Sequence, residues 1–169
     1  MPPRLTSDLP PPWSTEGPVQ AEVFVLRMDS GVALLAGPCG PDPWYIEVGD
    51  DEDPVEVVAR LSRKLMGEPL LVHSTSWRRA RGSVILTFVV VNRDDQALVY
   101  AGIPIGRSAL ARNTATSAPV AIAYQQVLEH GLRHLAWLVK DDEVVRDTLS
   151  SEWKTLLAGY VPEPFRHLG

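Results

Sequence analysis

Runs of apolar and β-branched residues, separated by turn residues, dominate the first half of the chain. Residues 21–28 (AEVFVLRM) and 32–37 (VALLAG) flank the turn formed by residues 29–31 (DSG), a pattern that predicts a β-hairpin. A short strand is predicted at 44–49 (WYIEVG), between Pro43 and an acidic loop. The chain therefore begins its folded part with β-structure.

Two longer apolar runs follow at 70–77 (LLVHSTSW) and 83–91 (SVILTFVVV), and both are predicted to be strands. The basic segment 78–82 (RRARG) is predicted to connect them, and residues 97–100 (ALVY) are expected to add another strand. These segments predict a mixed sheet.

Helical spacing first appears between the acidic loop and these strands. Asp53 can accept backbone N–H bonds as N-cap, Pro54 fits the first turn, and Glu56 completes a capping box. Gly67 supplies the C-terminal stop, which predicts a helix over 53–66. Its apolar face is predicted from Val55, Val58, Leu61, Leu65 and Met66, and its polar face from an i,i+4 pair of Glu56 and Arg60.

The C-terminal part reads as helical. An irregular loop over 101–118 precedes a helix from Pro119 to about Lys140, and a second helix is predicted from Asp142 to about Gly159. The predicted buried faces are Val120, Ala123, Val127, Leu128, Leu135 and Leu138 in the first helix, and Val144, Val145, Leu149, Trp153 and Leu156 in the second. The fold class expected is therefore α+β, with a mixed sheet sandwiched between helices and an additional C-terminal helix.

Length and composition refine this picture. With 169 residues, the chain fits one domain over 20–160, with a proline-rich tail at 1–19 and a C-terminal tail at 161–169 that straps the domain. A formal net charge of -5 supplies no basic field, so no nucleic-acid partner is expected, and no apolar run is long enough to predict a membrane partner. The single cysteine, Cys39, is interpreted as a loop cysteine, and a reduced, cytoplasmic protein is expected.

The order of strands, acidic loop, helix, strands and C-terminal helix resembles the Nudix fold over residues 21 to about 138. That family carries the pattern G-x5-E-x7-R-E-U-x-E-E-x-G-U, in which U is a bulky aliphatic residue and the glutamates late in the helix bind a divalent metal. When Gly67 is set on the late glycine, Arg60 falls on the arginine and Glu52 on the early glutamate. The first glycine falls on Ile46, and the last aliphatic position falls on Glu68.

The three helical glutamates of the pattern fall on Leu61, Lys64 and Leu65. Magnesium prefers oxygen ligands, so two leucines offer it nothing and a lysine repels it. The resemblance therefore implies the scaffold of a hydrolase without its usual metal site. The basic residues Arg63 and Lys64, beside Arg60, are candidates to hold an anion, although the solvated face of a helix has the same composition.

Three other groups of residues are candidate sites. A relocated metal site is conceivable from Glu47, Asp50, Glu52 and Glu56, although acidic residues before a helix also complement its dipole. His130 and His134 have the i,i+4 spacing of zinc ligands, but no third ligand is evident, and two partly exposed histidines beside the core are the preferred interpretation. The basic and aromatic cluster that suits a nucleotide-like anion, or else forms a polar hairpin loop, comprises Trp77, Arg78, Arg79 and Arg81.

These observations predict a Nudix-like ligand-binding or interaction protein without the metal-dependent activity, with a nucleotide-like anionic small molecule as partner and a homodimer left open. The alternative is a divergent hydrolase of nucleoside diphosphate derivatives that uses the loop over 50–56. It would need Mg or Mn, with Glu52 or Glu56 as metal ligand or base and Arg60 orienting a carboxylate. No cofactor is expected otherwise. A structural scaffold without a small ligand is the third reading.

Overall fold

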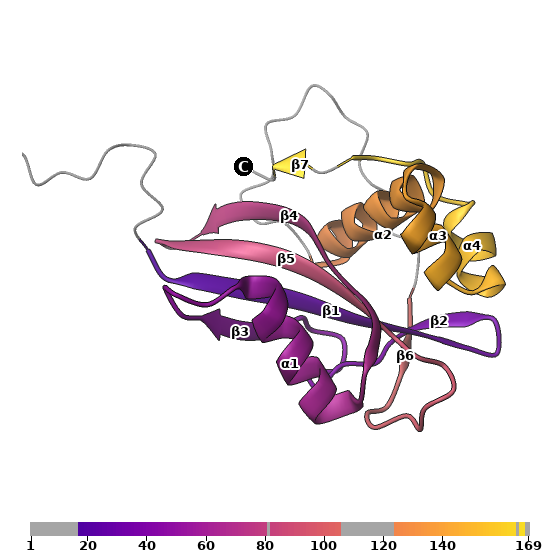
Figure 1. Ribbon diagram of the computed structural model, residues 1–169, viewed down its shortest axis with the longest axis horizontal. Coiled ribbons are helices and arrows are strands. Elements are labelled where there is room, and N and C mark those ends of the chain that lie inside the picture. The colour runs from indigo at the N-terminus through magenta and orange to yellow at the C-terminus, as the bar shows by residue number, and fades with distance from the viewer. Residues whose placement is uncertain (1–16, 81, 106–123, 165, 168–169) are drawn as a thin grey trace, which may run out of the picture.

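The computed structural model describes residues 17–80, 82–105, 124–164 and 166–167, which form a mixed β-sheet with helices on both faces (Figure 1). This is the α+β class that the residue pattern predicts. The strands are β1 (Val19–Asp29), β2 (Val32–Leu35), β3 (Trp44–Val48), β4 (Pro69–Ala80), β5 (Ser83–Asn92), β6 (Ile103–Pro104) and β7 (Arg166–His167). The helices are α1 (Pro54–Met66), α2 (Tyr124–Asp141), α3 (Glu143–Thr148) and α4 (Ser151–Leu157).

The long strand β1 organises the sheet, whose order is β6-β2-β1-β5-β4-β7. One edge of β1 pairs with two antiparallel strands in turn, first β3 through Val19 to Val23 and then β2 through Leu26 to Asp29. Its other edge pairs in parallel with β5, from Val19 opposite Val84 to Leu26 opposite Val91. Because β1 and β5 are central, their apolar side chains line both faces of the sheet.

Local turn chemistry explains the two hairpins. Ser30 and Gly31 both have positive φ angles, 48° and 80°, the backbone shape of a turn that matches the twist of paired strands. The hairpin between β4 and β5 closes at Ala80 opposite Ser83, beside Gly82 with a φ of 78°. Glycine adopts this left-handed conformation without the steric cost of a side chain.

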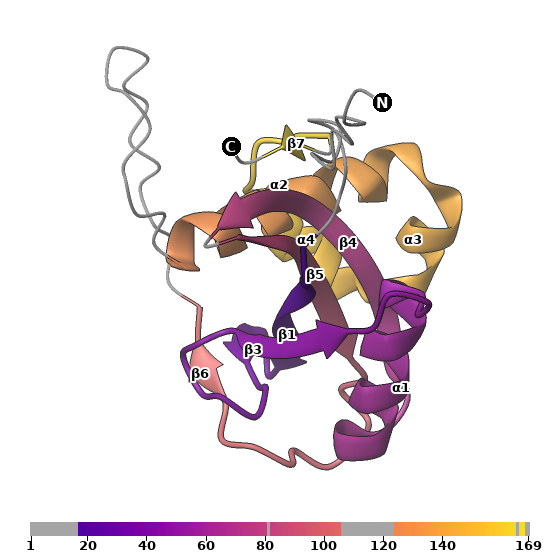
Figure 2. The same cartoon turned by 90° about the vertical axis from the view of Figure 1, so that its left-hand side faces the viewer.

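Helix α1 covers one face of the sheet, and β3 lies near it in Figure 2. The Asp53 side chain accepts a hydrogen bond from the Val55 N–H at 2.8 Å, which confirms the predicted N-cap, and the helix ends at Gly67. Val57 and Val58 pack with Phe88 and Val90 of β5 in the smaller of two cores. The helix is therefore fixed by its cap and by one buried apolar face.

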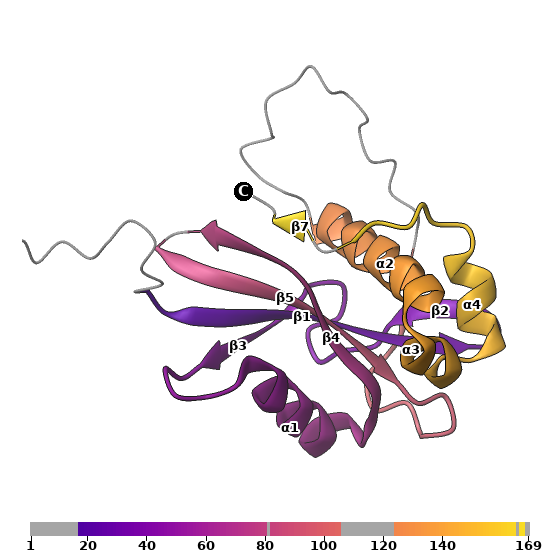
Figure 3. The ribbon, with the colours of Figure 1, turned by 45° about the horizontal axis from the view of Figure 1, so that its top comes forward.

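The opposite face is covered by α2, α3 and α4 (Figure 3). The larger core lies there, where Leu132 and Leu135 of α2 and Trp153 of α4 pack against Phe24 and Leu26 of β1. The close approach of α2 depends on Gly131, because a Cβ atom at that position would lie 2.9 Å from Cγ2 of Val89. This core contains more buried residues than the core under α1. Packing of the C-terminal helices on the sheet therefore contributes much of the hydrophobic stabilisation of the fold.

The C-terminal segment crosses α2 as the predicted strap. The Glu163 N–H donates to the carbonyl of Arg133 at 3.1 Å, and Arg133 Nη1 contacts Glu163 Oε1, also at 3.1 Å. Beyond it, β7 pairs in parallel with Ser76 and Trp77 of β4. These contacts join the chain end to both a helix and the sheet.

Two predictions about the strands are wrong. The basic segment 78–82 is not only a connection, since Arg78 and Arg79 belong to β4, which continues to Ala80 opposite Ser83. Residues 97–100 form no strand, and the pairing expected there occurs instead at β6, inside the predicted irregular loop. Short strands at sheet edges depend on a partner, which the local sequence does not reveal.

The C-terminal helices also differ from the prediction. The expected helix from Asp142 to Gly159 is two helices, because Leu149 is extended and Ser150 caps α4 by accepting from the Trp153 N–H. Val144 is exposed, as are Val55 and Leu65 of α1, so these residues do not belong to the predicted buried faces. The predicted helix start at Pro119, with Val120 and Ala123, lies outside the described residues.

The boundary of the N-terminal tail shifts as well. Val19, which the sequence pattern places in the tail, belongs to β1, and the carbonyl of Pro18 already accepts from the Val84 N–H at 3.0 Å. The rest of the predicted tail, up to residue 16, lies outside the described residues. Within the part of the chain that the structure describes, no helix is long and apolar enough to cross a membrane.

Candidate functional site

Helix α1 places the positions that matter for the Nudix-like pattern on two sides. Leu61 packs against the core under the sheet, whereas Lys64 and Leu65 are exposed. No carboxylate stands at any of the three positions. The helix therefore presents a cation and an apolar side chain where the hydrolase pattern has metal ligands.

Arg60 pairs with Glu52, not with Glu56 as the helical spacing suggested. Its Nη2 lies 3.1 Å from Glu52 Oε1, and the other oxygen of Glu52 accepts from the Gly49 N–H at 3.0 Å. The Gly49 N–H is the main reason that the pKa of Glu52 lies below its usual value, and Arg60 adds to it. Both side chains are exposed, so the pair closes the loop before α1 without creating a secluded site.

The acidic loop does not gather into a metal centre. Glu47, Asp50 and Glu56 are exposed on β3, in the loop and on α1, and Glu52 is turned toward Arg60. Among the residues that the structure describes, no three side chains of His, Cys, Asp or Glu lie where they could hold one metal ion. His130 and His134 likewise have no third ligand beside them in the described part of the chain.

The basic cluster is divided by the geometry of a strand. Successive side chains of β4 point to opposite faces, so Arg78 and Arg79 cannot face one ligand together on the same side of the sheet. Arg79 is exposed, Trp77 is half-buried, and Arg81 lies outside the described residues. On α1, Arg63 forms an ion pair with Glu68, which raises the pKa of Arg63 and lowers that of Glu68.

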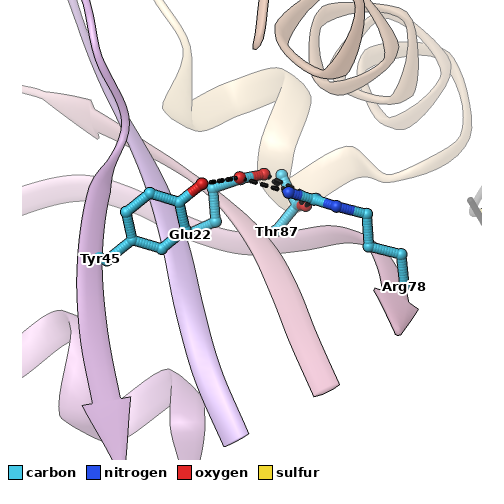
Figure 4. A network of polar contacts seen from close by, with 4 residues as sticks. All are labelled: Glu22, Tyr45, Arg78 and Thr87. Atoms are coloured by element: carbon cyan, nitrogen blue, oxygen red, sulfur yellow. Dashed lines mark hydrogen bonds and ion pairs between the residues drawn. The ribbon is translucent and has the colours of Figure 1, made fainter. Parts of the chain in front are cut away.

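Arg78 takes part in a polar network that crosses four strands (Figure 4). Its Nη1 and Nη2 donate to the two oxygens of Glu22 on β1, at 2.8 and 2.5 Å. Glu22 also accepts from the Tyr45 hydroxyl on β3 at 2.7 Å and from the Thr87 hydroxyl on β5 at 3.3 Å. These four donors occupy most of the hydrogen-bond acceptor sites of the Glu22 carboxylate.

The Glu22–Arg78 pair of the network is buried, whereas Tyr45 is exposed. The Glu22 side chain is 0% exposed and that of Arg78 is 12% exposed. Hydrogen bonding to Glu22 raises the pKa of Arg78, while burial, followed by hydrogen bonds with Tyr124 and Glu22, raises the pKa of Tyr45. The phenol therefore stays neutral and the arginine charged, so this group ties strands together and does not shuttle protons.

A pair of histidines joins the sheet to α2. His73 Nε2 on β4 lies 3.0 Å from His134 Nε2 on α2, and the His134 ring also contacts Trp137. Burial, and next the neighbouring His73, lowers the pKa of His134 to about 4, and burial also lowers the pKa of His73. His134 is thus a buried neutral histidine and not the partly exposed one expected, whereas His130 contacts Glu163 at 3.2 Å.

An open cavity of about 260 Å³ lies between the end of β5 and the junction of α3 with α4. The residue pattern gave no sign of it, since its walls come from three separated segments. They are Leu70 on β4, Asn92 to Asp95 at and after the end of β5, and Asp147 to Ser150 with Trp153 around the junction. Cys39 is exposed in its loop.

Comparison with known proteins adds no assignment. No family model matches the chain, and no curated protein matches it at a significant level. The residues themselves must therefore support any functional proposal.

Proposed function

We propose that this chain is a binding protein built on a Nudix-like arrangement, without the metal-dependent hydrolase chemistry of that family. One observation carries the proposal: among the described residues, the acidic side chains of β3, the loop and α1 do not gather around one point, and Glu52 pairs with an arginine. Arg60 holds Glu52, Arg63 holds Glu68, and Arg78 holds Glu22. Carboxylates occupied by arginines are poor ligands for a divalent cation, because the guanidinium already neutralises them.

The positions of Leu61, Lys64 and Leu65 support the same proposal. A hydrolase of nucleoside diphosphate derivatives needs a cation that neutralises the pyrophosphate and orients the attacking water. General acid–base catalysis contributes roughly 10²–10⁴-fold, which does not replace that cation. The chain is therefore proposed to bind its partner without hydrolysing it.

The proposal is tested by seeking the activity it excludes. The purified chain is incubated with a panel of nucleoside diphosphate derivatives and with Mg or Mn, and phosphate products are measured. We expect no turnover above that of the variant Glu52→Gln/Glu56→Gln. Metal-dependent turnover that this variant loses, and that the control Asp51→Asn in the same exposed loop retains, would establish the hydrolase alternative instead.

Two partners proposed from the sequence are tested in the same preparation. A nucleotide-like anion that binds the folded chain raises its melting temperature without added metal. A homodimer is revealed by the mass measured by light scattering after size exclusion. If neither is found and no ligand in a broad panel changes the melting temperature, the structural scaffold is the better description.

A further inference from the structure

A second, much smaller cavity lies on the α1 face of the sheet, where the end of α1 meets β1 and β5. Its volume is about 10 Å³, and Arg27 of β1, Met66 of α1 and Asn92 of β5 line it. The segment that follows β5 completes the wall, with Arg93 and Gln96 among its residues. We call this space the α1 cavity.

Two buried polar atoms of the lining residues have no hydrogen-bond partner in the described part of the chain. One is Nε of Arg27, which is a donor, and the other is Oδ1 of Asn92, which is an acceptor. The remaining groups of these side chains are engaged elsewhere. Arg27 Nη2 donates to the carbonyl of Asp94 at 3.1 Å, and Asn92 Nδ2 donates to the Met66 sulfur at 3.7 Å.

Strand geometry places these two atoms near one another. Arg27 and Asn92 immediately follow the last paired positions between the neighbouring strands β1 and β5. Successive side chains of a strand point to opposite faces, so Arg27 shares the face of Val25 and Asn92 that of Val90. Val25 and Val90 both belong to the core under α1. A donor and an acceptor from adjacent strands therefore face the same small cavity.

We propose that the α1 cavity binds one water molecule, which accepts a hydrogen bond from Arg27 Nε and donates one to Asn92 Oδ1. Buried polar groups without a partner are unfavourable, because they lose the hydrogen bonds that they make with solvent in the unfolded chain. Buried water commonly satisfies such groups in globular proteins. One water molecule satisfies both atoms here.

Size and chemistry select water over other small ligands. A cavity needs roughly 10–15 Å³ of space to admit one water molecule, and the α1 cavity, at about 10 Å³, admits nothing larger. An anion would suit the Arg27 donor but would be repelled by the Asn92 oxygen. An ammonium ion would suit the oxygen but not the arginine. Water is both donor and acceptor and matches the pair.

The water site goes beyond the proposed binding function, because it concerns how the sheet, α1 and the segment after β5 are held together. Arg27 already contacts that segment through the carbonyl of Asp94. Gln96 of the same segment lies against Gly67, where a Cβ atom would be 2.5 Å from Oε1 of Gln96. The bound water extends the connection between β1 and β5 past their last paired residues.

The test uses the full chain and the ε-methyl group of Met66 as a probe, since this group lines the cavity and has no exchangeable proton. Magnetisation transfer from water to this methyl group is measured by ¹³C-filtered NOE and ROE experiments. Water that stays longer than the chain takes to tumble gives NOE and ROE peaks of opposite sign, whereas passing surface water does not. We expect peaks of opposite sign in the wild-type chain.

The two partners are tested by Arg27→Met, which removes the donor, and by Asn92→Leu, which removes the acceptor. Both variants should lose the peaks. The matched control is Arg93→Met, because Arg93 lines the same cavity but its Nε is paired with Asp95. This control should keep the peaks.

Three results would overturn the proposal. The first is the lack of opposite-sign peaks in the wild-type chain, and the second is their persistence in both Arg27→Met and Asn92→Leu. The third is a crystal structure in which Arg27 Nε and Asn92 Oδ1 contact one another directly, without an intervening oxygen atom. The hydrolase assay has no bearing on any of these results, so the two proposals fail separately.

Discussion

Glu22 and Arg78 are separated by one strand of the sheet, yet both terminal nitrogens of Arg78 reach the two oxygens of Glu22. The strand between them, β5, contributes Thr87 to the same network. The pair is buried, so its two charges depend on one another. Removing one partner leaves the other charge without compensation in a poorly solvated site.

We predict that Glu22→Gln lowers the free energy of unfolding by about 3–5 kcal/mol, because Arg78 stays buried without its carboxylate. The variant Glu22→Leu/Arg78→Met should cost clearly less than the sum of its two single changes. Urea denaturation of the wild-type chain, Glu22→Leu, Arg78→Met and the double variant measures this coupling. Tyr45→Phe, which removes a single donor, should cost only ~1 kcal/mol. Strictly additive losses for the Glu22 and Arg78 changes would contradict the prediction.

The histidine pair predicts sensitivity to acid. The pKa of His134 is about 4 in the folded chain, against an ordinary value of 6.5, so the unfolded chain binds a proton first as the pH falls. The stability contributed by neutral His134 is therefore complete above pH 6.5 and is lost between pH 6.5 and about 4. His73, whose pKa is also lowered, contributes in the same direction.

The loss due to His134 should reach ~3 kcal/mol. Denaturation curves at a series of pH values measure it, and His134→Gln should flatten the decline over that range. The control His130→Gln changes a histidine on the same helix that contacts Glu163 instead of His73. An equal decline in the wild-type chain and in His134→Gln would rule out this origin of the acid sensitivity.

The Glu52 carboxylate offers a test of the geometry before α1. The Gly49 N–H is the larger cause of its lowered pKa, and Arg60 the smaller. We therefore expect Arg60→Ala to raise the pKa of Glu52 only part of the way toward its ordinary value. A ¹³C NMR titration of the Glu52 side-chain carboxyl measures this pKa in the wild-type chain and in Arg60→Ala. A complete return to the ordinary value would mean that the Gly49 contact is absent in solution.

Gly131 tests how closely α2 packs on the sheet. Alanine is the better helix former by ~1 kcal/mol, but its Cβ would lie 2.9 Å from Cγ2 of Val89. Overpacking typically costs ~1–3 kcal/mol, so Gly131→Ala should destabilise the chain by about 1 kcal/mol overall. Val89→Ala in the same background should recover part of that loss by relieving the contact. A stabilised Gly131→Ala variant would show that α2 lies farther from β5.

Elements governed by short-range rules were the most predictable. The N-cap at Asp53, the end of α1 at Gly67 and the hairpin turn at Ser30 and Gly31 all appear where the pattern placed them. Each depends on a hydrogen bond or a backbone angle within a few residues. The break between α3 and α4 at Leu149 was missed, although Ser150 is itself a favourable N-cap and was the available signal.

The contacts of the charged residues were far less predictable. The residue pattern predicts that Arg60 pairs with Glu56 and that Arg78 is available to a ligand. In the fold, Arg60 pairs with Glu52 and Arg78 with Glu22. The sequence does not indicate a role for His73, because its partner His134 lies 61 residues away. The cavity near Trp153 likewise needs three segments to meet.

The sequence by itself determined where α1 and the strands β1 to β5 form, because period, caps and turns act over a few residues. Only the tertiary structure decided which charges meet, which histidine is buried and where a cavity opens. Arg78 and Glu22 lie 56 residues apart, and the parallel pairing of β1 with β5 is what brings their strands within reach. Such pairings arise when separate elements bury their apolar faces together, and the spacing of residues inside one element contains no record of them.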